Sequence, residues 1–177
     1  MNVSLNKMPG YKNKVTAQIG EFLACAALGK QGFIATPFAG NVPVFDVLVA
    51  DENCRSIPIQ VKASNSSSWK AWAIDWMKIS YNPKTKAQKY IGKANLINPH
   101  LIYIFVSISR SEKSPDRFFV IRKHQLQDVI IQGYSNWMNT KDWKRPKTPE
   151  SYDHRITATA LNGFESNWGI ISERING

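Results

Sequence analysis

Cysteine is scarce in this sequence, which contains two among 177 residues. Neither Cys25 nor Cys54 has a second cysteine or a histidine nearby at the spacing of metal ligands, so no zinc motif is recognisable. We expect two reduced thiols in a cytoplasmic protein, with a disulfide between them as the less common alternative. A chain of this length buries enough surface to fold as a single domain, residues 1–177, without such cross-links.

Long apolar segments are also missing. No run approaches the roughly 20 apolar residues that span a bilayer, and the polar segment Met1–Lys14 lacks the apolar region of a signal peptide. The sequence has neither a glycine-rich phosphate-binding loop nor a nucleophile elbow. We therefore expect no membrane partner and no export, and the sequence argues against a P-loop nucleotidase or a serine hydrolase.

Acidic residues are few. Only 13 Asp and Glu residues stand against 23 Lys and Arg residues, which gives a net charge of +10. A surface of this charge gains free energy when it releases the counterions of a polyanion. Nucleic acid is thus the first partner to consider, although anionic membranes and acidic proteins are attracted by the same field.

The first recognisable element is a helix. The apolar residues of segment 16–28 recur with the 3.6-residue period of an amphipathic helix, and Thr16 is a suitable N-cap. Residues 33–38 then predict a short strand, ended by Pro37 and Gly40. Two segments with alternating side chains follow, and the polar connection between them is short, which predicts a hairpin.

Asp46 on the first strand of this hairpin (44–50), and Gln60 and Lys62 on the second (57–64), are polar side chains on otherwise apolar strands. Residues two apart on a strand point to the same side, about 6 to 7 Å apart. Asp46 joins that pair only if it lies across from one of them, which requires a bulge or an odd-numbered loop of about three or five residues. A loop of two or four residues would turn Asp46 to the other face.

The order of these residues resembles the PD-(D/E)XK nucleases, which carry a glutamate in the first helix, an aspartate on one strand, and an acid or amide, any residue and lysine on the next. Here the residues are Glu21 in Gln-Ile-Gly-Glu-Phe, Asp46 in Val-Phe-Asp-Val-Leu, and Gln60 and Lys62 in Ile-Gln-Val-Lys-Ala. The resemblance covers residues 16–64. It implies an α/β (α+β) fold with a restriction-endonuclease-like core, in which helices flank a mixed central β-sheet.

The resemblance also implies a catalytic and metal-binding role for these residues. The Asp46 carboxylate, the Gln60 amide oxygen and the Val61 carbonyl would hold Mg²⁺ or Mn²⁺, and Glu21 would hold that ion through water or help a second one. The metal would polarise the phosphoryl oxygen and acidify its bound water. Lys62 would orient or activate the attacking water and offset transition-state charge. We further expect the first helix to pack across Asp46, Gln60 and Lys62.

Two positions depart from the family pattern. Phe45 stands where proline is usual, with Pro43 further upstream, and Gln60 replaces an acid, as it does in the similar homing endonucleases and some RecB-like nucleases. A neutral amide should bind the metal less tightly than a carboxylate, and Glu21 is the candidate for the missing negative charge. Taken singly, each of the four residues has an ordinary structural explanation. The ordered set on the expected elements is what favours a site.

Segment 64–95 breaks the alternation with a serine-rich stretch and then with aromatic residues interleaved with lysines, which predicts a basic insertion. Such a mixture is typical of a surface that tracks a nucleic-acid backbone and stacks on its bases, although we expect at least two of the tryptophans in the core. The lysines predicted to bind nucleic acid are Lys70, Lys78, Lys84, Lys86, Lys89 and Lys93.

Further along the chain, segments 101–109 and 117–122 predict strands, 123–132 predicts a short helix, and 136–150 predicts mostly loop. The residues from Ile156 onward are ambiguous. A second basic group occupies this loop beside two tryptophans. The histidines lack the spacing of metal ligands and are expected to be structural, except that His154 is a possible substrate contact.

The leading hypothesis is a metal-dependent DNA endonuclease of the restriction, homing or junction-resolving type, which hydrolyses phosphodiester bonds. Cleavage of both strands needs two active sites, so we expect a homodimer or a higher homo-oligomer. The alternative is a nucleic-acid-binding module on the same fold that has lost catalysis through Gln60. A third possibility is a protein-interaction domain with a basic face, which would show no salt-dependent affinity for DNA.

Overall fold

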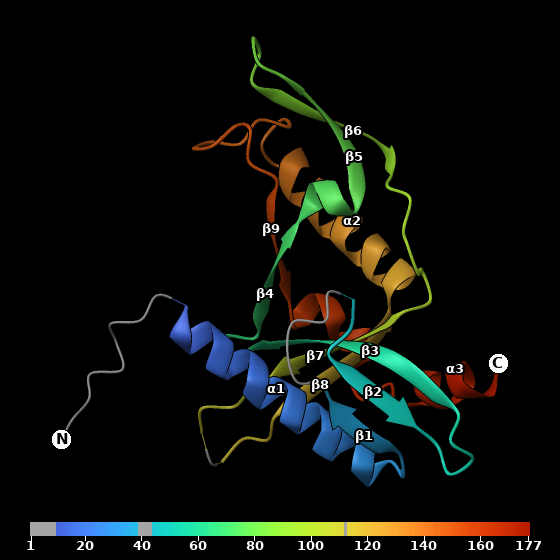
Figure 1. Ribbon diagram of the computed structural model, residues 1–177. Coiled ribbons are helices and arrows are strands. Elements are labelled where there is room, and N and C mark those ends of the chain that lie inside the picture. The colour runs from blue at the N-terminus through green and yellow to red at the C-terminus, as the bar shows by residue number, and fades with distance from the viewer. Residues whose placement is uncertain (1–9, 39–43, 112) are drawn as a thin grey trace.

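A mixed five-stranded sheet lies at the centre of the computed structural model, which describes residues 10–38, 44–111 and 113–177 (Figure 1). The strand order is β1-β2-β3-β7-β8, with β3 and β7 parallel and the other neighbours antiparallel. Helices cover both faces, so the predicted mixed sheet flanked by helices is confirmed. The strands are β1 (Ile34–Pro37), β2 (Val47–Ala50), β3 (Ser56–Ser64), β7 (Ile102–Ser107) and β8 (Arg117–Arg122).

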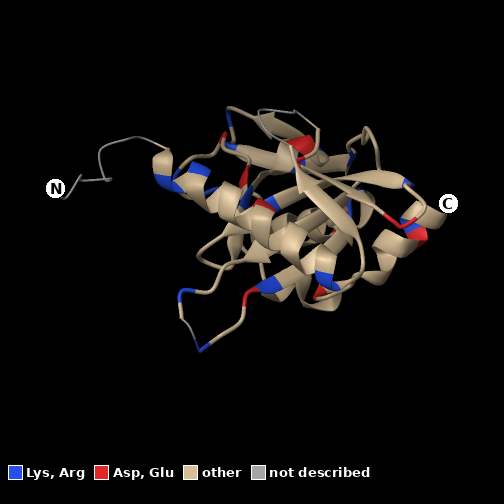
Figure 2. Ribbon diagram, turned by 60° about the horizontal axis from the view of Figure 1, so that its bottom comes forward, with Lys and Arg blue, Asp and Glu red and all other residues tan. Residues whose placement is uncertain are grey.

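Helix α1 (Tyr11–Lys30) is longer than its apolar pattern indicated, and it begins after Gly10 instead of at Thr16. The predicted N-cap is therefore wrong. The Oγ1 atom of Thr16 accepts a hydrogen bond of 2.9 Å from Asn65, which ties the helix to the chain just after β3. Figure 2 shows α1 in front of the sheet, with basic residues near its beginning.

Helix α1 covers the face of β3 that carries the odd-numbered, apolar side chains, and its own buried residues share one core with them. At Gly20 the helix touches the strand, because a Cβ atom there would lie 2.2 Å from the Cβ of Ala63. Side chains alternate along a strand. The helix thus packs on the face opposite to Gln60 and Lys62, and the expectation that it packs across Asp46, Gln60 and Lys62 is wrong. Burying apolar surface decides which face the helix covers.

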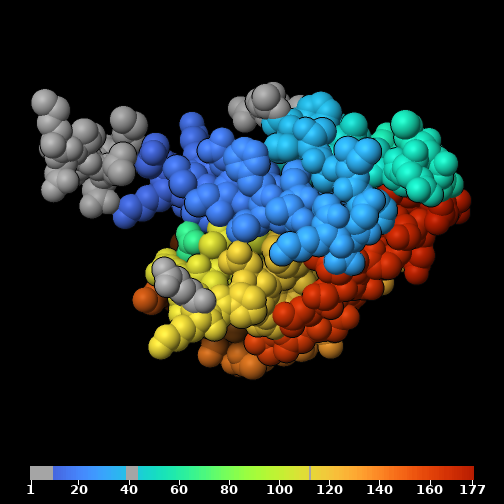
Figure 3. Space-filling model, turned by 90° about the horizontal axis from the view of Figure 1, so that it is seen from below, coloured from blue at the N-terminus to red at the C-terminus, as the bar shows by residue number. Residues whose placement is uncertain are grey.

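The same core includes helix α3 (Gly169–Asn176), which packs beside the sheet at the end of the chain. Seen from below, the segment after α1 and the C-terminal segment lie next to each other at the surface (Figure 3). The sequence left this region ambiguous. The structure resolves it into a 3₁₀ helix, η3 (Thr159–Phe164), followed by α3.

A second layer covers the opposite face of the sheet. Phe105 and Phe119 turn into its core, where their rings lie 5.1 and 6.0 Å from that of the buried Trp69. Trp69 is therefore a core residue, as expected for part of the aromatic segment. The elements of this layer are β4 (Ser68–Trp72), the 3₁₀ helix η2 (Ala73–Asp75), α2 (Lys123–Asn139) and β9 (Asp153–Thr157), with β4 and β9 paired as an antiparallel ribbon.

A hairpin of β5 (Met77–Asn82) and β6 (Ala87–Lys93) extends from this layer (Figure 1). The segment predicted as an insertion, 64–95, thus contains three strands. It also has a topological role. Because β3 and β7 are parallel neighbours, the chain between them has to cross from one end of the sheet to the other, and this segment provides most of that crossover.

Helix α2 continues to Asn139, so the beginning of the predicted loop 136–150 is helical. Its buried residues recur every fourth position through Tyr134 and Met138, which extends the apolar stripe beyond the predicted end. Gly40 and Pro43 lie outside the described residues, as does most of the segment expected to lack a signal peptide. The described part of the chain has no helix with the length and apolar character that a membrane crossing needs.

Candidate active site

The turn between β2 and β3 decides where Asp46 lies. The two strands pair with Ala50 opposite Ser56 and Val47 opposite Ile59, and the connection 51–55 has five residues. This odd-numbered loop is the one that the site requires. The paired register ends with Val47 opposite Ile59, and the backbone N–H of Asp46 donates to the carbonyl of the same Ile59 at 2.9 Å, which holds Asp46 beside the following residue, Gln60.

Asp51 fixes the conformation of this turn. Its Oδ1 atom accepts backbone N–H bonds from Asn53 and Arg55 at 3.0 and 2.9 Å, and its Oδ2 atom accepts the Arg55 guanidinium at 2.8 and 2.6 Å. Asp residues commonly hold turns in this way, by accepting hydrogen bonds from the backbone that follows. The hairpin register is thus encoded locally.

The Asp46 carboxylate lies beside β3 at the position that one more β2 residue, before Val47, would occupy. Strand β2 begins at Val47, whereas β3 continues to Ser64, so the edge of β3 beyond Ile59 has no β2 residue beside it. Asp46 Oδ2 accepts the backbone N–H of Val61 at 2.8 Å. The N–H and C=O of one strand residue point to the same side, so the Val61 carbonyl also faces this edge.

Gln60 completes a compact polar group with these two residues. Its side chain is 9% exposed, and its Nε2 atom donates to Asp46 Oδ2 and, at 3.5 Å, to the Val61 carbonyl. The amide nitrogen therefore faces the two oxygens, whereas a metal ligand would present the amide oxygen. Turning the amide by half a rotation exchanges the two atoms.

Glu21 is half-buried on α1. Burial raises the pKa of its carboxyl, the negative charge of Asp46 raises that pKa further, and the positive charge of Lys62 opposes the rise. The Glu21 carboxyl is therefore influenced by the charges of both Asp46 and Lys62, although α1 packs on the other face of the sheet. Lys62 itself is exposed, two residues beyond Gln60 on the same face of β3.

The donor set suits a hard cation. Two carboxylates, an amide and a main-chain carbonyl supply only oxygen ligands, the type that Mg²⁺ and Mn²⁺ prefer. The Nε2 atom of Gln60 donates to both the Asp46 carboxylate and the Val61 carbonyl, so these two oxygens lie near each other. Among the described residues, no group of three or more His, Cys, Asp or Glu side chains could hold a metal ion, so Gln60 and the backbone are needed to complete a site here.

Tyr103 is a neighbour of this group that the sequence did not reveal. It pairs with Gln60 in the parallel ladder between β3 and β7. Burial and the negative charge of Asp46 raise the pKa of its hydroxyl. Its ring lies against Trp76 of the second layer, with ring centroids 6.2 Å apart. The strand was predicted, but nothing local to it shows which strand it pairs with.

The six predicted DNA-binding lysines are all exposed. Lys78 and Lys89 lie on the strands of the β5–β6 hairpin, and Lys84 and Lys86 lie in its turn. These four make the hairpin a basic arm.

The other two lysines lie at the base of the arm and on β4. Lys93, at the end of β6, forms an ion pair with Asp128 of α2. Lys70 lies on β4, in the ribbon that pairs with β9. The predicted nucleic-acid contacts are therefore divided between the arm and the second layer.

Both described cysteines are free. No protein family model matches the chain, and no curated protein does. Among solved structures, the chain is similar to a bacterial homing endonuclease, I-Ssp6803I, with 13% sequence identity over 91% of this chain and 93% of that one, and with a TM-score of 0.47. A similarity this distant does not assign a family or an activity.

Proposed function

We propose that this protein is a metal-dependent DNA endonuclease that hydrolyses phosphodiester bonds at the group formed by Glu21, Asp46, Gln60, Val61 and Lys62. One observation carries the proposal. The Asp46 carboxylate meets the Val61 backbone and the Gln60 amide at the open edge of β3, and the charges of Asp46 and Lys62 both act on the Glu21 carboxyl. The net charge of +10 favours a polyanionic substrate.

The residues of this group would divide the work of hydrolysis. Asp46, the Val61 carbonyl and the Gln60 amide oxygen would hold Mg²⁺ or Mn²⁺, which supplies Lewis-acid polarisation of the phosphate and an acidified water. Glu21 would add the negative charge that the neutral Gln60 lacks. Lys62 would place its ammonium group near the attacking water and offset the charge that develops on the phosphate. Cleavage of a duplex at two such sites would require a homodimer or a larger assembly.

Plasmid nicking tests the proposal. Asp46→Asn should abolish nicking while DNA binding stays within about threefold, because this carboxylate acts on the metal and not on the phosphate backbone. Asp75→Asn, which changes an exposed acid of η2, is the matched control and should nick at the normal rate. Excess chelator should stop the unmodified protein. Nicking that survives both Asp46→Asn and chelator would overturn the proposal.

A second candidate function is a DNA-binding module without catalysis. It is favoured by the orientation of Gln60, whose amide nitrogen satisfies Asp46 in place of a cation. The two functions differ in how nicking responds when position 60 carries an acid, as it usually does in the PD-(D/E)XK pattern. If the module is inactive only because it binds metal poorly, Gln60→Glu should create Mg²⁺-dependent nicking where the unmodified protein shows none.

A further inference from the structure

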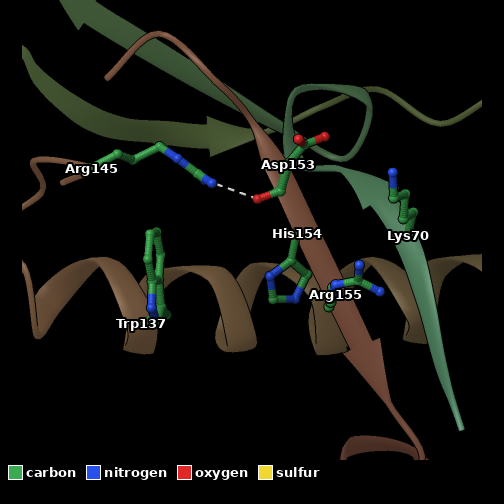
Figure 4. A pocket seen from close by; sticks show the side chains of 6 residues that line it. All are labelled: Lys70, Trp137, Arg145, Asp153, His154 and Arg155. Carbon is green, nitrogen blue, oxygen red and sulfur yellow. Dashed lines mark hydrogen bonds between the residues drawn. The ribbon is translucent and has the colours of Figure 1, made fainter. Parts of the chain in front are cut away.

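A cavity of about 530 Å³ lies in the second layer, away from the Asp46 group (Figure 4). None of its lining residues belongs to the candidate active site. Its volume falls within the roughly 300–1,000 Å³ of small-ligand sites. Four separate segments of the chain build it. The lining residues are Lys70, Trp137, Arg145, Asp153, His154 and Arg155.

The cavity carries an excess of positive charge. Three cations, Lys70, Arg145 and Arg155, face one carboxylate, that of Asp153. Lys70 and Arg155 are directly opposite each other in the β4–β9 ladder, and like charges in that arrangement repel. Within the described residues, none of the three cations forms an ion pair. An anionic ligand would relieve this repulsion.

Arg145 is held in a fixed orientation. Its Nη1 atom donates to the Asp153 carbonyl at 2.9 Å, and its guanidinium carbon lies 4.8 Å from the ring centroid of Trp137 (Figure 4). The guanidinium has five N–H donors in a planar fork that suits phosphate oxygens. Trp137 is 37% exposed, so part of its ring remains available to a ligand. An oriented arginine beside an exposed indole offers a phosphate contact next to a stacking surface.

His154 adds an uncharged polar group. Figure 4 shows its ring between Trp137 and Arg155. The ring packs on α2 at Gly133, where a Cβ atom would lie 3.0 Å from Nε2, and edge-on to Tyr134, with centroids 5.8 Å apart. Burial, helped by the charge of Arg145, lowers the pKa of His154 to about 4. The neutral imidazole has one donor and one acceptor, which is the complement of a nucleobase edge and not of a second phosphate.

We propose that this cavity binds one nucleotide of a single-stranded DNA segment, with its phosphate against Lys70, Arg145 and Arg155 and its base against Trp137 and His154. A base inside a duplex is paired and stacked, so an unpaired nucleotide is the form that can enter. The proposal rests on the proposed function only for the choice of DNA as the strand. A free nucleotide shares the same chemistry, and the test separates the two sources.

Binding of a fluorescently labelled five-nucleotide single strand, measured by anisotropy with chelator present, tests the proposal. Trp137→Ala should weaken binding about 5- to 150-fold, the range for the loss of one base-stacking contact. Trp137→Phe keeps a stacking ring and should restore most of the affinity, which separates the loss of a contact from misfolding. Trp72→Ala is the matched control, because Trp72 is 56% exposed on β4 but does not line the cavity.

The charge contribution has its own matched pair. Arg155→Gln should weaken binding of the same strand at least fivefold and lower the slope of its salt dependence by about 0.7, the single-strand value for one phosphate contact. Arg110→Gln, which changes an exposed residue outside the cavity, should leave both unchanged. A fully paired duplex should bind Trp137→Ala and the unmodified protein equally.

Three results would overturn the proposal. They are equal losses for the Trp72 and Trp137 variants, no loss for either cavity variant, and equal affinity for the single strand and for thymidine monophosphate used as a competitor. The nicking assay remains independent of this test. If Asp46→Asn stops nicking but Trp137→Ala binds the strand normally, the cavity proposal fails alone. If nicking never occurs but the cavity variants lose binding, the endonuclease proposal fails alone.

Discussion

Oxygen atoms converge at the N-terminal end of β2, in the candidate active site around Asp46, which is called the strand-end site below. In the cavity of the second layer, cations converge instead. At the strand-end site, the negative charge of Asp46 repels that of Glu21. In the cavity, the positive charges of Lys70 and Arg155 repel each other. Each cluster is electrostatically unbalanced within the described part of the protein. The two proposed partners, a cation for the strand-end site and a phosphate for the cavity, each carry the charge that would balance the cluster they bind.

Two lysine variants offer the strongest way to break this comparison. Lys62→Ala should lower the single-turnover cleavage rate about 10²- to 10³-fold with little change in DNA affinity, because its charge acts in the transition state. Lys70→Ala should weaken single-strand binding and leave the single-turnover rate at saturating DNA unchanged. Quenched-flow cleavage and anisotropy give the two numbers. If each lysine changed both quantities equally, the two clusters would act as one site.

Gly20 tests how far the strand-end site depends on the contact between α1 and β3. Gly20→Ala forces a Cβ atom to within 2.2 Å of the Ala63 Cβ. Chemical denaturation should show a loss of about 1–3 kcal/mol in unfolding free energy, the usual cost of overpacking. Cleavage should fall as well, since the helix carries Glu21.

Gly29 is the matched control on the same helix. A Cβ atom there meets nothing within 4 Å, so Gly29→Ala should be neutral or stabilise by up to about 1 kcal/mol through helix propensity. Single-strand binding in the cavity should be normal in both variants. Equal stability of the two variants would mean that α1 does not need its close approach to the strand.

Gln60→Glu sharpens the comparison by adding charge to the oxygen cluster. The variant loses the Nε2 donor to Asp46, so its unfolding free energy without metal should fall by about 1–3 kcal/mol. Millimolar Mg²⁺ should restore more stability in this variant than in the unmodified protein, as thermal melting would show.

A double-mutant cycle on cleavage tests whether Glu21 and Gln60 serve the same metal. Glu21→Gln should reduce cleavage less in the Gln60→Glu background, because the carboxylate introduced at position 60 supplies the negative charge that Glu21 otherwise provides. If the effects of the two substitutions on cleavage were strictly additive, Glu21 and Gln60 would not act on the same metal ion.

Per pH unit, His154 gives the smallest effect, a pH dependence of stability that arises in the cavity. Its folded-state pKa of about 4 lies below the ordinary value of 6.5, so between these values the unfolded chain binds a proton that the folded chain does not. The unfolding free energy should therefore fall as the pH is lowered through this window, by up to about 1.4 kcal/mol per pH unit. His154→Asn should flatten the slope, whereas His100→Asn, at an exposed position, should keep it. A slope unaffected by His154→Asn would assign the acid sensitivity to another group.

The sequence predicted the parts of the strand-end site that depend on local periodicity. Alternation placed Gln60 and Lys62 on one face. The loop length, on which the position of Asp46 depends, stayed open until the structure showed five residues, 51–55, between the paired strands. The sequence did not predict which face α1 would cover, because that depends on where the apolar odd-numbered side chains meet the helix at Gly20. Nor did it predict the start of α1, because residues 11–14 are exposed and add nothing to the apolar pattern of the helix.

The cavity could not be predicted, because no local pattern contains it. Lys70 and Arg155 face each other only after β4 pairs with β9, and the two segments are distant in the sequence. His154 was singled out from its neighbours alone. The signal that was available is Gly133, a glycine within an otherwise regular helix, which makes room for the His154 ring.

The crossover between β3 and β7 has a consequence for how such a protein can diversify. The parallel pair needs a connection of a dozen or more residues, but it does not specify what that connection contains. The strands β4, β5 and β6 occupy this obligatory length, and the strand-end site has its own framework outside them. An exchanged segment would have to retain the edge of β4 that β9 pairs with and the buried side chains of Trp69, Ala73 and Met77 in the second-layer core. Chimeras that join this core to foreign crossovers of equal length would thus be a route to new target preferences with unaltered chemistry.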